Sequence, residues 1–252
     1  MDNDVFDKRR YTGLEPEEMR NLVEGLLRES DDLTGENGEV SREEYRKLLL
    51  ADWPGPESPL KLSQNTAGSV ALDVRFVDNS RIFLKTALEE EGIKATEAGN
   101  IEVDFVYEFL DAMDFGPNSV DSPCEISDYG DETEARPLHI LRVVLEVAGL
   151  LELNQGVFLP TPRGEELLSP GEGPELMREL FVTHFRDFNL AFFTRGGELP
   201  RIQALFPHYL YRLSQLEPDV GWQNRLDIAE YLIPSILQGD SEGHEMEILS
   251  SL

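Results

Sequence analysis

The sequence has little cysteine, little lysine and no long apolar run, and each shortage excludes a class of protein. Cys124 is the single cysteine among 252 residues, which excludes an intramolecular disulfide and a zinc site built on several cysteines. No apolar run approaches the roughly 20 residues that a membrane-spanning helix needs. The N-terminal stretch MDNDVFDKRR is not followed by the apolar segment of a signal peptide. We therefore expect a cytoplasmic protein.

Basic residues are also scarce. The chain has 22 Lys and Arg residues, of which only 5 are Lys, against 50 acidic residues, and its formal net charge is −28. Because nucleic-acid affinity depends mainly on neutralising phosphates, this charge disfavours nucleic acid as a partner, and it does not attract anionic lipid. The charge suits a basic partner, or a cytoplasm in which high salt screens self-repulsion. High acidity with few lysines favours salt adaptation as the reason.

The usual signatures of catalysis are missing. The sequence contains no HExxH, no GxSxG and no glycine-rich phosphate loop, and its four histidines lack the spacing of metal ligands. His184 lies three residues before Asp187, but on an aromatic-rich stretch this is typical of a partly buried structural histidine. We expect a protein that is not an enzyme and that requires no cofactor.

The chain does contain a mainly helical pattern. With 40% hydrophobic and 29% charged residues it is typical of a globular protein. Residues 14–29 have the apolar spacing of an amphipathic helix, and Ser41 followed by Glu44 predicts a capping box at the start of a second helix. Four phenylalanines spaced 4, 3 and 4 apart predict one buried face of a single later helix: Phe181, Phe185, Phe188 and Phe192.

A helix, a glycine, two short strands and another helix are predicted twice, at a constant offset of 57 residues. The copies lie in RIFLKTALEEEGIKATEAGNIEVDFVYEFLDAM and HILRVVLEVAGLLELNQGVFLPTPRGEELL, and Leu84 of the first matches Leu141 of the second. Gly92 and Gly149 are predicted to end helices in the left-handed conformation, and Gly99 and Gly156 to lie in hairpin turns. In the second copy, a helix ending in AGLL, a hairpin and the run TPRGEELL are typical of a winged helix.

These patterns predict a mainly α fold with small β-hairpins, built on two winged-helix-like units plus a C-terminal helical region. The order is an N-terminal helical region, a first winged-helix-like unit, an acidic linker, a second winged-helix-like unit, the C-terminal helical region and an acidic tail. The predicted boundaries are 1–60, 61–116, 117–135, 136–170, 171–237 and 238–252.

A winged helix that binds DNA places the helix before its wing in the major groove. The net charge of −1 on residues 136–168 permits this use but does not indicate it, and the net charge of −7 on residues 77–116 argues against DNA. Two interpretations stay open: both copies are packing modules that dock a protein, or the second copy reads DNA. The candidate DNA contacts are Arg136, His139, Arg142 and Gln155.

The stretch DDLTGENGEVSREEY, residues 31–45, has some features of a calcium loop. An EF-hand loop places oxygen ligands at positions 1, 3 and 5, a glycine at 6 and a bidentate glutamate at 12. With Glu44 at position 12, Gly38 falls at 6, but Leu33 falls at 1 and offers no side-chain oxygen. The alternative is an acidic turn before a capped helix. The candidate metal ligands are Asp32, Asn37, Ser41 and Glu44.

Five stretches carry a family resemblance: SPLKLS, NSRIFLKTALEEEGIKATEAGNIEVDFV, LHILRVVLEVAGLL, FLPTPRGEELL and LFVTHFRDFNLAFF. Together, over roughly residues 58–215, they resemble a bacterial family of uncharacterised proteins whose members often occur beside, or fused to, the plasmid ORF-3-like domain. No ORF-3-like domain is recognisable in this chain. The resemblance implies no activity, cofactor or catalytic residue.

We therefore expect a non-enzymatic, cytoplasmic interaction or regulatory protein, whose helix faces and wings dock a protein partner or a second copy of the chain. The first alternative is a DNA-binding transcriptional regulator, and the second is a calcium-modulated binding protein that uses the irregular EF-hand-like loop. A basic surface stripe would favour DNA, and an exposed apolar patch would favour a protein partner. A deep pocket with converging polar groups would favour an enzyme.

Overall fold

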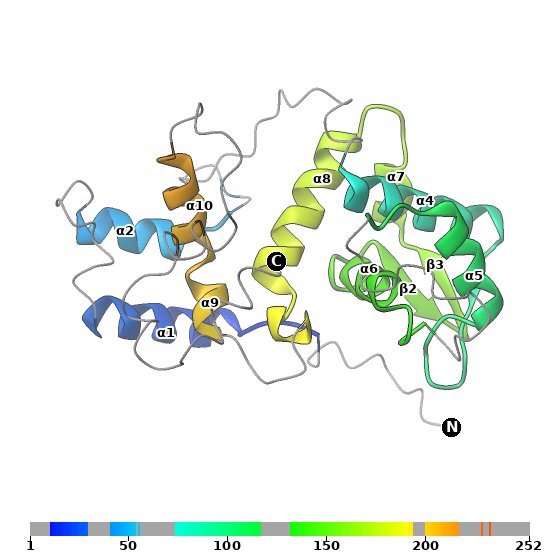
Figure 1. Ribbon diagram of the computed structural model, residues 1–252, viewed down its shortest axis with the longest axis horizontal. Coiled ribbons are helices and arrows are strands. Elements are labelled where there is room, and N and C mark those ends of the chain that lie inside the picture. The colour runs from blue at the N-terminus through cyan, green and yellow to red at the C-terminus, as the bar shows by residue number, and fades with distance from the viewer. Residues whose placement is uncertain are drawn as a thin grey trace. The chain divides into compact units, whose positions relative to one another are not determined.

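The computed structural model describes residues 11–29, 41–53, 55, 74–116, 132–193, 200–216, 228 and 232. The chain divides into two compact units (Figure 1). Unit 1 consists of Met1–Thr12 and Leu62–His184, and unit 2 consists of Gly13–Lys61 and Phe185–Leu252. Both predicted repeat copies therefore belong to unit 1, whereas most of the predicted N-terminal and C-terminal helical regions belong to unit 2. The predicted acidic tail, and the predicted linker up to residue 131, lie outside the described residues.

Unit 1 is mainly helical with one small antiparallel sheet, which confirms the predicted fold class. The sheet of this unit has three strands, and β3 lies between β1 and β2. The elements are α4 (Arg75–Glu89), β1 (Ile93–Lys94), α5 (Val103–Ala112), α6 (Arg136–Val147), β2 (Leu151–Asn154), β3 (Val157–Pro160), α7 (Pro162–Leu167) and α8 (Gly173–Val182). No helix among the described residues is long and apolar enough to cross a membrane.

The sheet joins the two repeat copies. Strand β1 comes from the first copy and pairs antiparallel with β3 of the second, with Ile93 opposite Phe158. The second copy forms the predicted hairpin, in which β2 pairs with β3. In the first copy the predicted hairpin is reduced to a single bridge between Ala95 and Ile101. The two copies therefore share one sheet, and neither has a complete sheet of its own.

The glycines of the repeat take the conformations that the sequence predicts. Gly92 and Gly149 follow α4 and α6 with φ angles of 118° and 70°. Leu150 donates its backbone N–H to the Leu145 carbonyl at 2.9 Å, a bond that ends α6 in the manner of a Schellman motif. In the hairpin, Gln155 and Gly156 both have positive φ, 51° and 83°, as a two-residue type I′ turn requires.

The TPRG stretch connects the end of α6 to the start of α7. The Thr161 hydroxyl accepts the Gly164 N–H at 3.2 Å and donates to the Gly149 carbonyl at 2.7 Å. A Cβ atom on Gly164 would lie 2.2 Å from the Leu150 carbonyl oxygen, so the backbones approach too closely for any side chain. The threonine and the glycine of this motif thus have a local packing role.

The core of unit 1 lies between the helices and the sheet. Phe83 of α4 stacks on Phe109 of α5 with ring centroids 4.6 Å apart. Phe158 of β3 and Ile93 of β1 are completely buried on the same side of the sheet. Each such side chain contributes about 1.5–3 kcal/mol relative to an exposed one, so the joined copies are held by burial as well as by backbone pairing.

Unit 2 is helical in its described part. Its elements are α1 (Pro16–Glu29), α2 (Arg42–Leu49), the 3-10 helix η4 (Leu190–Phe193), α9 (Pro200–Ala204) and α10 (Phe206–Ser214). Helix α1 contacts α2 and α9, and α2 contacts α10. Val23 of α1 and Leu49 of α2 are completely buried in this group.

The prediction of one continuous aromatic helix is wrong. Helix α8 ends at Val182, a π-helical turn, η3 (Thr183–Asp187), follows it, and η4 comes after a break. Phe188 is completely buried beyond the π turn, and Phe185 stacks on Phe206 of α10 at 4.1 Å. Of the four phenylalanines only Phe188 is fully buried, the other three are half-buried, and the four do not share one helix face.

Candidate functional site

Helix α6, which the sequence offers as a DNA-reading helix, lies inside unit 1. All of its residues from 138 to 146 are buried, polar and apolar alike. Helices α4 and α5 and strand β2 contact it, as the grouping in Figure 1 shows. Two of the candidate DNA contacts, His139 and Arg142, are therefore buried side chains of unit 1. The polar atoms of both side chains bond to carboxylates inside unit 1.

Four buried side chains form what we call the ion cluster: Glu132, His139, Arg142 and Glu146. Arg142 donates from Nε to Oε1 of Glu132 at 2.8 Å, and it also donates to Glu146 one turn along α6. The other oxygen of Glu132 accepts the Ile101 N–H at 2.9 Å. His139 Nδ1 hydrogen-bonds to Glu132 as well. The ion cluster thereby ties α6 of the second copy to the backbone of the first.

The charges in the ion cluster are stabilised by one another. Burial opposes ionisation of Glu132, but the His139 hydrogen bond and the charge of Arg142 outweigh it and hold the pKa of Glu132 below its usual value. Burial also opposes the charge on Arg142, but Glu132 and Glu146 outweigh it and raise the pKa of Arg142. The guanidinium lies 5.1 Å from the centre of the Phe158 ring. With Arg142 only 2% exposed, no phosphate or base edge reaches it.

The other two DNA-contact candidates lie apart from the ion cluster. Arg136 is the first residue of α6 and is half-buried, whereas Gln155 is exposed at the tip of the β2–β3 hairpin. Glu132 has a central role in the ion cluster, although the sequence places it in a supposed linker. The only sequence signal for the cluster is the i, i+4 spacing of Arg142 and Glu146 on α6.

Most cations in the described part of unit 1 are already bonded to the protein. Arg163 of α7 contacts glutamates in α7 and α8, and its bonds to Glu179 and Glu166 raise its pKa above the ordinary value. Arg81 donates to the carbonyls of Leu167 and Leu168, at the end of α7. The remaining pairs are the exposed Arg75 with Asp114 and Lys85 with Glu89, and the half-buried Arg178 with Glu175. These pairings leave little positive surface for a phosphate backbone.

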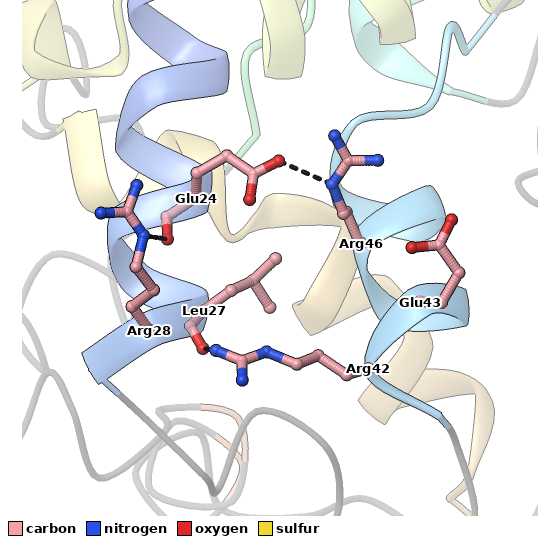
Figure 2. A pocket seen from close by; sticks show the side chains of 6 residues that line it. All are labelled: Glu24, Leu27, Arg28, Arg42, Glu43 and Arg46. Atoms are coloured by element: carbon pink, nitrogen blue, oxygen red, sulfur yellow. Dashed lines mark hydrogen bonds and ion pairs between the residues drawn. The ribbon is translucent and has the colours of Figure 1, made fainter.

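Unit 2 contains a hollow between α1 and α2 that we call the arginine hollow (Figure 2). It encloses about 420 Å³ and has Leu27 as its apolar residue. Figure 2 shows Arg42 and Arg46 reaching from α2 toward α1, whereas the guanidinium of Arg28 lies on the side of α1 away from α2. The lining residues are Glu24, Leu27, Arg28, Arg42, Glu43 and Arg46.

Each arginine of the hollow is held in place by one bond. Arg28 donates from Nε to the Glu24 carbonyl at 3.1 Å, and Arg42 donates to the Leu27 carbonyl near the end of α1. Arg46 donates to the Glu24 carboxylate at 2.6 Å, and this bond raises the pKa of Arg46. A guanidinium has five N–H donors, so these bonds orient the groups and leave donors for another acceptor.

The calcium-loop residues that the structure describes belong to a helix cap. Ser41 is the N-cap of α2, and its hydroxyl accepts the Glu44 N–H at 3.2 Å. The Glu44 carboxylate in turn accepts the Ser41 hydroxyl at 2.7 Å and the Ser41 N–H at 2.9 Å, and these bonds lower the pKa of Glu44. The predicted capping box is confirmed. The other two candidate ligands, Asp32 and Asn37, lie outside the described residues.

The described residues contain no group of three or more His, Cys, Asp or Glu side chains that could hold a metal ion. His184, which the sequence places near Asp187, packs edge-on against Phe76 at 5.5 Å, and burial lowers its pKa to about 4. His208 is buried in unit 2, where Tyr45 donates its hydroxyl to Nδ1 and Nε2 donates to the Leu232 carbonyl at 3.2 Å. Burial lowers the pKa of His208 to about 4 as well.

In the comparison with known protein families, residues 73–173 match the family model described as the Y4jL N-terminal domain. The match begins just before α4 and ends at the start of α8, so it contains both repeat copies and the ion cluster. It supports the resemblance to an uncharacterised bacterial family and names no activity. No curated protein matches the chain, and no solved structure matches it.

Proposed function

We propose that this chain is a non-enzymatic interaction or regulatory protein, whose unit 1 is a winged-helix-like module that docks another protein rather than DNA. The observation that carries the proposal is the burial of α6. A DNA-binding helix must present a polar face to the major groove. Here residues 138–146 are all buried, and the guanidinium of Arg142 is bonded to Glu132 and Glu146.

The order of elements supports the winged-helix assignment. The chain runs through helix α4, strand β1, helices α5 and α6, and then strands β2 and β3, and the sheet places β3 between β1 and β2. A winged helix has this order, with the last two strands forming the wing. We therefore assign both repeat copies to a single winged helix, in which α4 is the first helix and α6 is the third.

Electrostatics disfavour DNA for the same module. Residues 77–116 carry a net charge of −7. In the described part of unit 1, the arginines outside the ion cluster are mostly paired with carboxylates or carbonyl groups. A module that loses several ion pairs on binding a phosphate backbone would gain little net affinity, because each freed carboxylate would repel the DNA.

Apolar side chains remain accessible on another part of unit 1. Leu88 of α4 is 45% exposed, a larger fraction than the exposed Val74 and Leu213 have. It lies one turn before Gly92. The backbone of Gly92 lies so close to Val157 and Leu159 of β3 that a Cβ atom added to Gly92 would be 3.0 Å from the Val157 Cβ. We call the exposed Leu88, together with the half-buried Val157 and Leu159 that lie near Gly92, the Leu88 face. We propose that this face receives an apolar segment of a protein partner.

A photo-crosslinking amino acid placed at position 88 tests the proposal in cells of the source organism. The same amino acid at position 104, where Asp104 is exposed on α5, is the matched control. We expect one discrete protein adduct from position 88 and none from position 104. The purified partner should then bind the wild-type chain and lose affinity for Leu88→Glu. Equal adducts from both positions, or unchanged affinity of Leu88→Glu, would contradict the proposal.

A further inference from the structure

We infer that the protein segment received by the Leu88 face is basic, with an arginine or lysine beside its apolar anchor residue. This partner chemistry rests on the proposed function, because it describes the partner that docks there. Leu88, Val157 and Leu159 form the apolar part of the surface. Exposed carboxylates border it on two sides, at the end of α4 and along β2.

The outer face of the sheet carries the two aliphatic side chains of β3. Phe158 and Ile93 are completely buried on the inner side of the sheet. Side chains alternate along a strand, so Val157 and Leu159 lie on the outer side. Residues that are paired across strands share a face, which places the exposed Glu152 of β2 beside Leu159. A carboxylate therefore borders the apolar side chains on the β2 side.

Three more carboxylates follow Leu88 at the end of α4. Glu89 is the last residue of the helix, Glu90 is its C-cap and Glu91 comes next, and all three are exposed. The C-terminal end of a helix has a partial negative charge, which favours a cation there and disfavours a carboxylate. The last turns of α1, α2 and α10 contain basic residues, whereas the last turn of α4 contains none. We call the four exposed carboxylates the acidic rim: Glu89, Glu90, Glu91 and Glu152.

Two nearby lysines neutralise only part of the acidic rim. Lys85 pairs with Glu89 at 3.5 Å, and Lys94 is exposed on β1. Within the part of the chain that the structure describes, no ion pair includes Glu90 or Glu91. The four glutamates and two lysines leave a net charge of −2 around the Leu88 face. Its negative charge is therefore available to a cation from outside the chain.

A basic segment with an apolar anchor gains from both parts of this surface. Its apolar side chain is removed from water against Leu88, and its basic side chain meets the acidic rim. A neutral segment gains only the apolar contact, and an acidic segment is repelled by the rim. At physiological ionic strength a charge acts over about 8 Å, so the rim acts mainly on the residues that flank the anchor. The net charge of −28 on the whole chain also speeds the approach of a basic partner.

Three synthetic peptides of equal length test the inference against the full chain. All contain the same leucines, which are flanked by arginine in the first peptide, glutamine in the second and glutamate in the third. Fluorescence anisotropy at constant ionic strength should show saturable binding of the arginine peptide, about threefold or more tighter than that of the glutamine peptide. Leu88→Ser should weaken the binding of both. A photo-crosslinking amino acid at position 88 should attach to the arginine peptide.

Two double variants with the same net charge separate the acidic rim from the charge of the whole chain. Glu90→Gln with Glu91→Gln should weaken the arginine peptide by about threefold to tenfold, as the loss of two exposed ion pairs allows. Glu108→Gln with Asp111→Asn removes two carboxylates from exposed positions on α5 and should leave the affinity unchanged. The rim variant should melt no lower than the wild type, because it removes carboxylates from a helix C-terminus. Its weaker binding would therefore not result from unfolding.

Three results would overturn the inference: equal affinities of the arginine and glutamine peptides, equal losses in the two double variants, or no saturable binding of the arginine peptide. The proposed function is decided separately, by the protein adduct that forms from position 88 in cells. A discrete adduct in cells, together with equal affinities of the arginine and glutamine peptides, would mean that the Leu88 face docks a partner without selecting its charge.

Discussion

Arg142 lies in the centre of unit 1 with its Nε atom 2.8 Å from Oε1 of Glu132, and both side chains are almost completely excluded from solvent. The pair joins α6 to a residue that the sequence places in a linker. Because Glu132 also accepts the Ile101 N–H, one carboxylate connects both repeat copies. The residue that would be the best base reader in a DNA-binding protein is here a structural residue of the core.

The ion cluster gives the first prediction. Arg142→Met should destabilise unit 1 by about 3–5 kcal/mol, because it leaves the Glu132 and Glu146 carboxylates buried without their cation. Urea denaturation followed by circular dichroism measures the change. Arg178→Met, which breaks the more exposed pair with Glu175, should cost about 1 kcal/mol or less and is the control. Similar costs for the two variants would show that Arg142 is not a buried partner.

The second prediction concerns acid and unit 2. The folded pKa of His208 is about 4 against an ordinary 6.5. Between these pH values the unfolded chain takes up a proton at His208 that the folded chain excludes. The contribution of His208 to the free energy of unfolding is therefore complete above pH 6.5 and decreases as the pH falls toward 4. The loss amounts to about 3 kcal/mol. His208→Phe should flatten the pH dependence of unfolding in this window.

Tryptophan fluorescence follows this transition selectively, because both tryptophans, Trp53 and Trp222, belong to unit 2. His184, with a folded pKa of about 4, belongs to unit 1 and supplies an independent acid response there. The imidazole resonances give the direct check by NMR titration. A His208 resonance that titrates near 6.5 in the folded chain would refute the prediction.

The third prediction contrasts two glycines. Gly164→Ala should destabilise unit 1 by about 1–3 kcal/mol, because the new Cβ would lie 2.2 Å from the Leu150 carbonyl oxygen and the backbone must shift. Gly25→Ala should instead stabilise unit 2 by about 0.5–1 kcal/mol, since Gly25 lies inside α1 and no atom is within 4 Å of the added Cβ. Thermal melts followed by circular dichroism measure both, and a reversed order of stability would contradict this packing.

The fourth prediction concerns calcium. Ser41 and Glu44 bond to one another at the start of α2, so a calcium ion would have to break the capping box before it could use either. We expect the chain to have the same melting temperature in millimolar CaCl₂ as in millimolar MgCl₂. Ser41→Ala should lower the stability of unit 2 by about 1 kcal/mol whether or not calcium is present. A saturable, calcium-specific rise in melting temperature would instead support the EF-hand-like hypothesis.

The features that the sequence predicts correctly are local ones. The capping box at Ser41, the left-handed glycines at 92, 99, 149 and 156, and the helical run of α1 each depend on residues within a few positions of one another. The mainly α fold with a small sheet follows from these local patterns. Sequence reasoning therefore locates the turns of both copies, the extent of α1 and the start of α2.

The features that it misses depend on distant partners. The pairing of β1 with β3 brings Ile93 beside Phe158, and no local pattern indicates that two similar copies share one sheet. The break in the aromatic helix is supported from a distance too, because Gln203 of α9 donates to the Arg186 and Phe188 carbonyls near the π turn. The arginine hollow likewise combines residues from two helices that lie on either side of residues 30–40.

The central claim is that unit 1 docks protein and does not read DNA. Fluorescence anisotropy of a labelled mixed-sequence DNA duplex, titrated with the folded chain from low to molar salt, tests it most directly. The buried α6 and the paired arginines predict no binding at any salt concentration. Binding at low salt that weakens steeply as salt rises, and that is lost in Arg136→Gln, would contradict the claim and restore the DNA-binding alternative.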